Sequence, residues 1–148
     1  MIRLLTIVTA SIALASCGNA SAQCATRDAQ GLVASMKPAE QFRSILTMAV
    51  GRTQTAAMVK ARDGVSGDQK LAQAIDAAVK RYSAEWEKNL VSSWQSLSAT
   101  EIGQACTAMQ KNDQKSFMPF AERVGPQVQS RNEPLLRSAA VEVLKTAW

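Results

Sequence analysis

The sequence contains no histidine. This absence excludes the Ser-His-Asp and Cys-His arrangements of nucleophilic catalysis, together with most zinc and copper sites. A metal would then depend on oxygen ligands or on the two cysteines Cys24 and Cys106, and Asp63–Asp68 is the one loop that combines two carboxylates with glycines. This loop lacks the regular Asp-x-Asp-x-Asp-Gly spacing and the distal glutamate of a calcium-binding loop. We therefore predict no catalytic residue, no cofactor and no metal site.

The sequence also lacks an apolar run long enough to cross a membrane as a helix. Arg3 is followed by the uncharged stretch Leu4–Ala15. This stretch has about twelve residues, whereas a membrane-spanning helix needs roughly twenty. A basic residue followed by a short apolar segment is typical of a secretory signal peptide. We therefore expect the chain to be exported.

Two processing sites are compatible with this leader. Leu14–Cys17 resembles the lipobox of bacterial lipoproteins, in which a small residue directly precedes the cysteine that is acylated. Ala20–Ala22 is a small-x-small site for ordinary signal peptidase. The first site gives a lipoprotein signal of residues 1–16, a lipid on Cys17 and a short tether. The second gives a signal peptide of residues 1–22.

Either outcome places the remaining domain, residues 24–148, in the cell envelope. The domain is then a membrane-anchored lipoprotein or a soluble periplasmic protein. The chain has three cysteines, of which Cys17 is either acylated or removed with the leader. Cys24 and Cys106 remain as an even pair, and an oxidising compartment favours a disulfide bond between them. The alternative is that they are two unrelated buried thiols.

Apolar residues recur every three or four positions through the rest of the chain, and no segment alternates as a strand would. This pattern predicts an all-α domain, a single compact bundle of five or six helices. Glycine and proline indicate a break at Asp63–Gly67, kinks at Pro119 and Pro126, and a turn at Asn132–Pro134. The expected helices cover residues 25–36, 38–62 and 69–95, a segment after Ser98, a segment around 117–128 and a last segment from Pro134.

Residues Leu97–Ile102 form a Leu-(Ser/Thr)-x-x-Glu-apolar step, and a helix that contains phenylalanine follows and reaches Phe120. Ser98 and Glu101 have the spacing of a helix capping box. This stretch resembles a family of exported bacterial all-helical proteins whose own function is uncharacterised. Met109–Asp113 stands where the family has an aromatic pair and a Ser/Thr-Pro-x-Gly step. The resemblance implies an exported helical protein and transfers no active site.

The most distinctive side chains of the domain are three aromatic residues of the expected helix 69–95. Tyr82, Trp86 and Trp94 are spaced by four or eight residues, so they lie along one slowly drifting helical stripe. One hypothesis is an apolar groove for a lipid tail, a peptide helix or a glycan ring, with indole N–H groups at its edge. The other hypothesis is that the stripe packs in the core.

The charged residues give little support to catalysis or to nucleic-acid binding. Glycoside hydrolysis needs two carboxyl groups at a set separation, or an acid in an apolar pocket. Glu101 is explained by the capping box, and Glu85 and Glu87 lie on opposite sides of their helix. Basic residues are scattered and interrupted by acidic ones, so we expect no nucleic-acid partner.

We therefore predict a non-enzymatic protein of the bacterial envelope, a lipoprotein if Cys17 is acylated, that binds a protein, lipid or cell-wall partner through one helical face. This hypothesis requires an open groove or apolar patch near Trp86 and Trp94. The alternatives are a small exported hydrolase that acts on cell-wall material, and a secreted inhibitor. The hydrolase requires a cleft that holds an unpaired carboxylate such as Glu101 or Glu85.

Overall fold

A computed structural model describes Cys24 and residues 26–148 of the chain. Within these residues there are six helices and no strand, which confirms the predicted all-α bundle. The expected signal peptide, Cys17 and both processing sites lie outside the described residues. No helix in the described part is both long and apolar enough to span a membrane. The helices are α1 (Ala29–Ser35), α2 (Pro38–Gly51), α3 (Gln54–Asp63), α4 (Val65–Trp94), α5 (Ala99–Gln110) and α6 (Gln114–Ala147).

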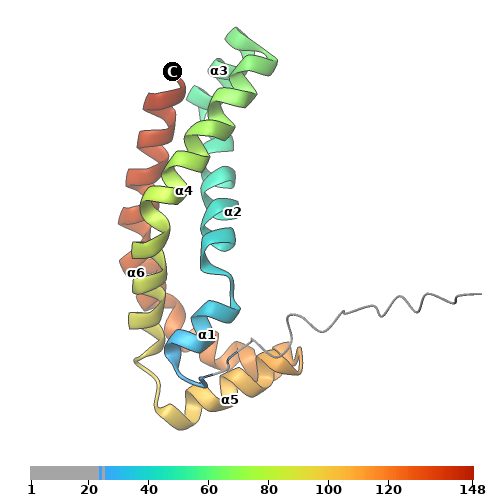
Figure 1. The fold of residues 1–148 in the computed structure, drawn as a ribbon, viewed down its shortest axis with the longest axis vertical. Helices are drawn as coiled ribbons and strands as arrows, with labels where there is room; N and C mark the ends of the chain where they lie inside the picture. The colour runs from blue at the N-terminus through green and yellow to red at the C-terminus, as the bar shows by residue number, and fades with distance from the viewer. Residues whose placement is uncertain (1–23, 25) are drawn as a thin grey trace, which may run out of the picture.

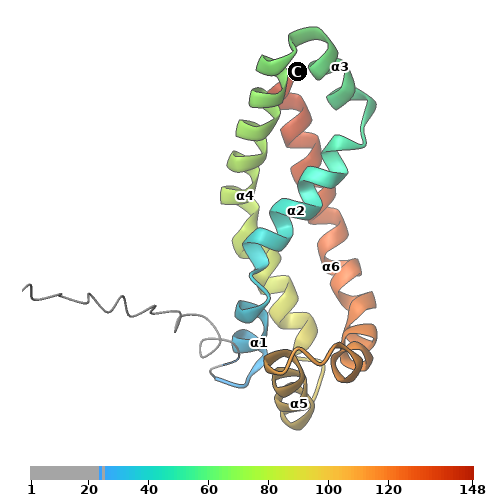
Figure 2. The same cartoon turned by 90° about the vertical axis from the view of Figure 1, so that its right-hand side faces the viewer.

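Two long helices, α4 and α6, lie side by side and form the frame of the bundle (Figure 1). α2 packs against both of them. α3 packs along the start of α4, and the C-terminus lies at this same end of the bundle (Figure 2). α1 and α5 contact each other at the opposite end. The bundle therefore has two differently built ends, joined by the three-helix packing of α2, α4 and α6.

Four of the six described helices begin with a side chain that accepts a hydrogen bond from a backbone N–H of the first turn. Such caps satisfy N–H groups that have no partner within the helix. The capping box predicted for α5 is confirmed: Ser98 Oγ accepts from the Glu101 N–H at 3.2 Å, and Glu101 Oε2 accepts from the Ser98 N–H at 2.9 Å. The capping residues are Asp28 of α1, Thr53 of α3, Ser98 of α5 and Asp113 of α6.

The prediction of one helix over residues 38–62 is wrong, because the chain divides this segment into α2 and α3. α2 ends at Gly51, and Thr53 has an extended backbone. The Thr53 hydroxyl accepts from the Ala56 N–H at 3.1 Å and so starts a new helix. In this way a threonine side chain replaces a backbone group as the hydrogen-bond partner, which favours the end of one helix and the start of another. The apolar period runs across the break because both helices face the same core.

The connection between α3 and α4 is shorter than the predicted break at Asp63–Gly67. Gly64 has φ 57°, a left-handed conformation that glycine adopts easily, and α4 begins directly after it at Val65. Asp68 therefore does not cap this helix. It lies in the first turn of α4, where Lys60 Nζ is 3.0 Å from its carboxylate.

The turn predicted at Asn132–Pro134 is also wrong, because α6 continues through it without interruption. A proline removes one N–H donor and leaves the carbonyl four residues earlier without its helical partner. In α6 the prolines are exposed, as are the residues that carry these carbonyls, so water can donate to them instead. The prolines are Pro119, Pro126 and Pro134, and the carbonyls are those of Lys115, Glu122 and Ser130.

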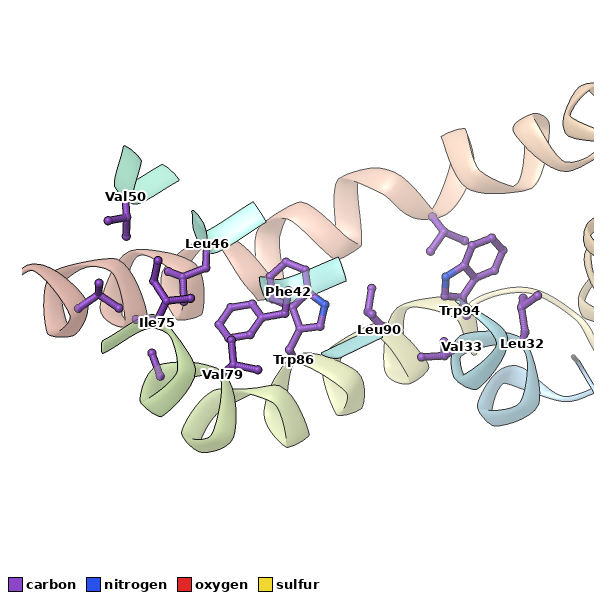
Figure 3. Packing of buried hydrophobic residues seen from close by; sticks show 14 of the residues in the cluster. Leu32, Val33, Phe42, Leu46, Val50, Ile75, Val79, Trp86, Leu90 and Trp94 are labelled. Atoms are coloured by element: carbon purple, nitrogen blue, oxygen red, sulfur yellow. The ribbon is translucent and has the colours of Figure 1, made fainter. Parts of the chain in front are cut away.

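The core is continuous along the bundle and has an aromatic contact at its centre. The ring centroids of Phe42 on α2 and Trp86 on α4 are 4.9 Å apart, and the rings are tilted by 35°. Figure 3 shows this contact between Leu46 on one side and Leu90 on the other. Both aromatic side chains are nearly inaccessible to solvent. Their packing therefore holds α2 against α4 at the centre of the bundle.

The close approach of α3 and α4 at Gly67 gives the first testable prediction. A Cβ added at Gly67 lies 2.6 Å from the Val59 carbonyl oxygen, which is backbone and cannot move aside cheaply. We expect Gly67→Ala to lower the free energy of unfolding by about 1–3 kcal/mol, the usual cost of overpacking. Denaturant unfolding monitored by circular dichroism measures the change.

Gly51→Ala is the matched control, because nothing lies within 4 Å of a Cβ added at that helical glycine. It should leave stability unchanged or raise it by up to about 1 kcal/mol, since alanine favours the helix. Equal effects of the two substitutions would contradict the packing assigned to α3 and α4.

Candidate functional site

The three aromatic residues of the predicted groove lie along α4, and the structure gives each a different environment. Tyr82 is half-buried, and its hydroxyl donates to Glu142 Oε2 at 2.7 Å. Arg81 donates to the other oxygen of Glu142, also at 2.7 Å. The bonds from Tyr82 and then Arg81 lower the pKa of Glu142, and the bond to Glu142 raises the pKa of Tyr82. Tyr82 therefore joins α4 to α6 and leaves its hydroxyl occupied.

Trp94 is a core residue in this structure. Its side chain is 4% exposed, and its ring centroid lies 5.6 Å from that of Phe117 on α6. Figure 3 shows it close to Leu32 and Val33 of α1. Trp94 thus fits the core-packing hypothesis of the aromatic stripe.

Trp86 combines core packing with a place at the surface of a cavity. One part of its ring packs on Phe42, and the residue is only 4% exposed. It also lines a cavity of about 270 Å³ between α4 and α6. The indole Nε1–H of Trp86 is buried and has no hydrogen-bond partner in the described part of the chain. The lining is mainly apolar and consists of Trp86 from α4 with Val128, Gln129, Asn132, Glu133 and Leu136 from α6.

Asn132 is a second lining residue of this cavity, and its amide nitrogen is inaccessible to solvent, as the Trp86 nitrogen is. The residue is 2% exposed, and its Nδ2 has no hydrogen-bond partner among the described residues. The orientation of the Asn132 amide follows from two hydrogen bonds of Asn89. Asn89 Nδ2 donates to the Arg131 carbonyl at 3.3 Å, and this bond shows which end of the Asn89 amide is the NH₂ group. The same Nδ2 donates to Asn132 Oδ1 at 3.0 Å. Asn132 must therefore keep its oxygen toward Asn89 and its NH₂ away from it.

The mouth of the cavity is polar and close to neutral. Gln129 and Glu133 are exposed residues of α6. Arg137, one turn further along the helix, places a guanidinium nitrogen 3.1 Å from the Glu133 carboxylate. The cavity therefore has an apolar wall formed with Val128 and Leu136, and an ion pair at its entrance.

A larger hollow at the α5 end of the bundle has Arg27 and Asp113, two of its charged groups, engaged by neighbouring groups of the chain. It measures about 390 Å³ and is lined by Arg27, by residues of α5, by Lys111 and Asp113 of the turn after α5, and by Ser116 of α6. Asp113 accepts from the N–H and the hydroxyl of Ser116. The Arg27 guanidinium donates to the Gly103 carbonyl and to Thr107 Oγ1, both at 2.7 Å. Arg27 thus ties the start of the domain to α5. The cavity at Trp86 differs because its lining is mainly apolar.

Cys24 and Cys106 lie next to each other, where the start of the described chain meets α5. They are 1% and 0% exposed, and both are free thiols in this structure, so the predicted disulfide bond is not formed in it. Burial, followed by hydrogen bonding to Cys24, raises the pKa of the Cys106 thiol to about 12. Cys24 Sγ also lies 3.7 Å from Ser35 Oγ. The two thiols are therefore neighbours, as the predicted pairing requires.

The carboxylates considered for hydrolysis do not form a catalytic pair. Glu101 accepts from Arg123 and from the Ser98 N–H, and these bonds lower its pKa. Glu85 is exposed on α4, and Glu87, two residues further along, is half-buried on the other side of that helix. The described residues contain no group of three or more cysteine, aspartate or glutamate side chains placed to hold a metal ion.

Asn132 and the α6 side of the cavity were missed by sequence reasoning. The segment before Pro134 has the composition of a turn, and the prediction followed that local signal. A different signal was present: Val128, Asn132 and Leu136 are spaced by four, which places them on one helix face. A polar residue inside an apolar stripe marks a position at which a buried hydrogen-bonding group faces a neighbour.

Comparison of the chain with protein-family models, curated proteins and solved structures found no match. The geometry therefore carries the functional argument alone. It defines an all-helical bundle with a mainly apolar cavity between its two longest helices.

Proposed function

We propose that the chain is an exported, non-enzymatic binding protein of the bacterial cell envelope, which takes its partner in the cavity between α4 and α6. The observation that carries this proposal is the mainly apolar cavity between α4 and α6, which has the exposed polar residues Gln129 and Glu133 at its mouth. An apolar pocket with a few polar groups at its edge is the usual form of a small-molecule or lipid site.

The environment of Glu101 supports binding over hydrolysis. A general acid in a glycosidase needs a raised pKa and a place beside the scissile bond. Contacts with Arg123 and the Ser98 N–H shift the pKa of Glu101 in the opposite direction. The capping box and the ion pair also give this side chain a structural role.

The proposal includes a lipid anchor on Cys17. Cys17 precedes Cys24 by seven residues, which span at most about 25 Å when extended. Cys24 is packed into the end of the bundle beside Cys106 of α5. An acylated Cys17 would therefore hold the α1 and α5 end near the membrane surface and direct the opposite end away from it.

Acylation of Cys17 is tested by labelling cells with a fatty-acid analogue. We expect the chain to carry the label and to fractionate with membranes, and Cys17→Ala to lose the label and appear in the soluble fraction. An unlabelled, soluble wild-type chain would contradict the anchor and leave the periplasmic form of the proposal.

The second covalent feature that we propose is a disulfide bond between Cys24 and Cys106. The thiols are already adjacent, so oxidation requires little movement of the bundle. Closing a loop of about eighty residues stabilises the folded state by up to about 4.5 kcal/mol in the chain-entropy model.

Peptide mass mapping under non-reducing conditions checks this bond in protein isolated from the envelope. Free thiols must be blocked after denaturation, because both cysteines are buried in the folded chain. We expect a linked peptide that contains Cys24 and Cys106, and a lower unfolding midpoint after reduction. Blocked thiols at both positions would show that the bond is absent.

Photo-crosslinking in cells tests the binding function itself. p-Benzoylphenylalanine in place of Gln129 puts a reactive group at the mouth of the cavity, on an exposed residue. The matched control has the same group in place of Gln73, which is exposed on α4 and does not line the cavity. We expect a discrete crosslinked product from position 129 and none from position 73.

Either a protein or a lipid in that product supports the proposed function. Absence of a product at position 129, or the same products at both positions, would refute the cavity as the binding site.

A further inference from the structure

Resting on the lipid anchor of the proposed function, we infer that the hollow at the α5 end of the bundle binds the phosphodiester group of a phospholipid headgroup. Arg27 and Lys111 supply the positive charge of this site, and both are exposed residues that a ligand can reach. The ligand class follows from the charge of the lining, the spacing of the two cations and the place of the hollow in the bundle.

The lining of the hollow carries more positive than negative charge. Its ionisable side chains are Arg27, Lys111 and Asp113. The Asp113 carboxylate accepts from the hydroxyl of Ser116 at 2.6 Å and from its N–H at 3.1 Å, and these bonds lower the pKa of Asp113. Lys111 forms no ion pair with a carboxylate in the described part of the chain. The surplus of positive charge matches a phosphodiester, which is a monoanion.

Arg27 is held in place by bonds that leave part of its guanidinium free. Both of its hydrogen bonds to α5 come from Nη2, one to the Gly103 carbonyl and one to Thr107 Oγ1, each at 2.7 Å. The N–H groups of Nε and Nη1 have no partner among the described residues. A guanidinium donates strongly to phosphate oxygens, and a guanidinium that is already oriented loses little freedom on binding.

Lys111 is placed to reach the same phosphate group. It is the C-cap residue of α5 and lies one helical turn after Thr107, which accepts from Arg27. Residues four apart on a helix have Cβ atoms about 5–6 Å apart. Helical side chains lean toward the N-terminus of their helix, so the Lys111 side chain extends toward Thr107 and Arg27. One phosphate can therefore contact both cations.

The hollow lies at the end of the bundle that the proposed anchor would hold near the membrane (Figure 1). Arg27 follows Cys24 by three residues, and Thr107 follows Cys106, the neighbour of Cys24. Seven extended residues between Cys17 and Cys24 span at most about 25 Å. An anchored chain therefore keeps this hollow close to phospholipid headgroups, which makes them the expected source of the phosphate.

The experiment titrates glycerophosphoglycerol, a soluble form of the phosphatidylglycerol headgroup, into the ¹⁵N-labelled chain processed after Ala22. This chain keeps every residue that the structure describes. We expect saturable NMR shifts of the backbone N–H signals of Gly103, Thr107 and Lys111, with little change in α3 at the opposite end. Lys111→Gln should weaken binding about fivefold, the usual weight of one cation at an anionic headgroup.

Lys115→Gln is the matched control, because it removes the same charge from an exposed residue of α6 that does not line the hollow. It should change the affinity by less than about twofold, as expected of an exposed charge outside the site. Arg27→Gln should also weaken binding. Because Arg27→Gln removes the bonds to α5 as well, circular dichroism checks its fold, and Lys111→Gln keeps the test decisive if that variant unfolds.

Vesicles and inorganic phosphate distinguish the two sources of a phosphate group. The processed chain should sediment with phosphatidylcholine vesicles that contain phosphatidylglycerol, and Lys111→Gln should lower the bound fraction more than Lys115→Gln does. Inorganic phosphate should bind more weakly than glycerophosphoglycerol, because it lacks the glycerol hydroxyls that Thr100 and Gln104 in the lining can bind. Tighter binding of inorganic phosphate would assign the hollow to free phosphate and overturn the inference.

No saturable shift with glycerophosphoglycerol, or equal effects of Lys111→Gln and Lys115→Gln, would also overturn the inference. If the headgroup does not bind but Cys17 is acylated and position 129 gives a crosslinked product, the inference alone is overturned and the proposed function stands. Headgroup binding by a chain that carries no lipid label in cells would support the hollow as a site and contradict only the anchor.

Discussion

The burial of the Trp86 indole where α2, α4 and α6 meet is the constraint on which the rest of the structure depends. Its ring packs on Phe42 and so fixes α2 against α4 at the centre of the bundle. The same side chain lines the cavity that α6 closes with Asn132. An unpaired buried N–H costs about 1–3 kcal/mol, and the Trp86 Nε1–H has no partner among the described residues. The packing that holds the bundle together therefore also fixes one wall of the cavity, at the expense of this hydrogen bond.

Most of the fold follows from the sequence, because apolar periodicity reports which face of each helix is buried. The stripe through Leu71, Val79 and Leu90 predicted α4, and the Ser98 capping box predicted the start of α5. The apolar period does not mark where one helix ends when the next helix along the chain faces the same core. For that reason the break at Thr53 was missed. Proline was over-interpreted in α6, where exposed carbonyls make its missing hydrogen bonds tolerable.

The candidate site was only half accessible to sequence reasoning. Trp86 stood out by its type and its spacing, but its partner Asn132 lies on a helix whose pairing with α4 depends on the tertiary fold. Tyr82 and Trp94 share the stripe with Trp86, yet contacts with Glu142 and Phe117 give them structural roles. The adjacency of Cys24 and Cys106 was expected from their even number and agrees with the packing, although both are free thiols here.

A crystal structure of the chain purified from the envelope tests the central claim most directly, namely that the packing of Trp86 on Phe42 leaves an open, mainly apolar cavity between α4 and α6. We predict that the two rings are in contact and that the cavity is open and holds a bound molecule. A collapsed cavity, in which Val128 and Leu136 pack directly on Trp86, would contradict the claim.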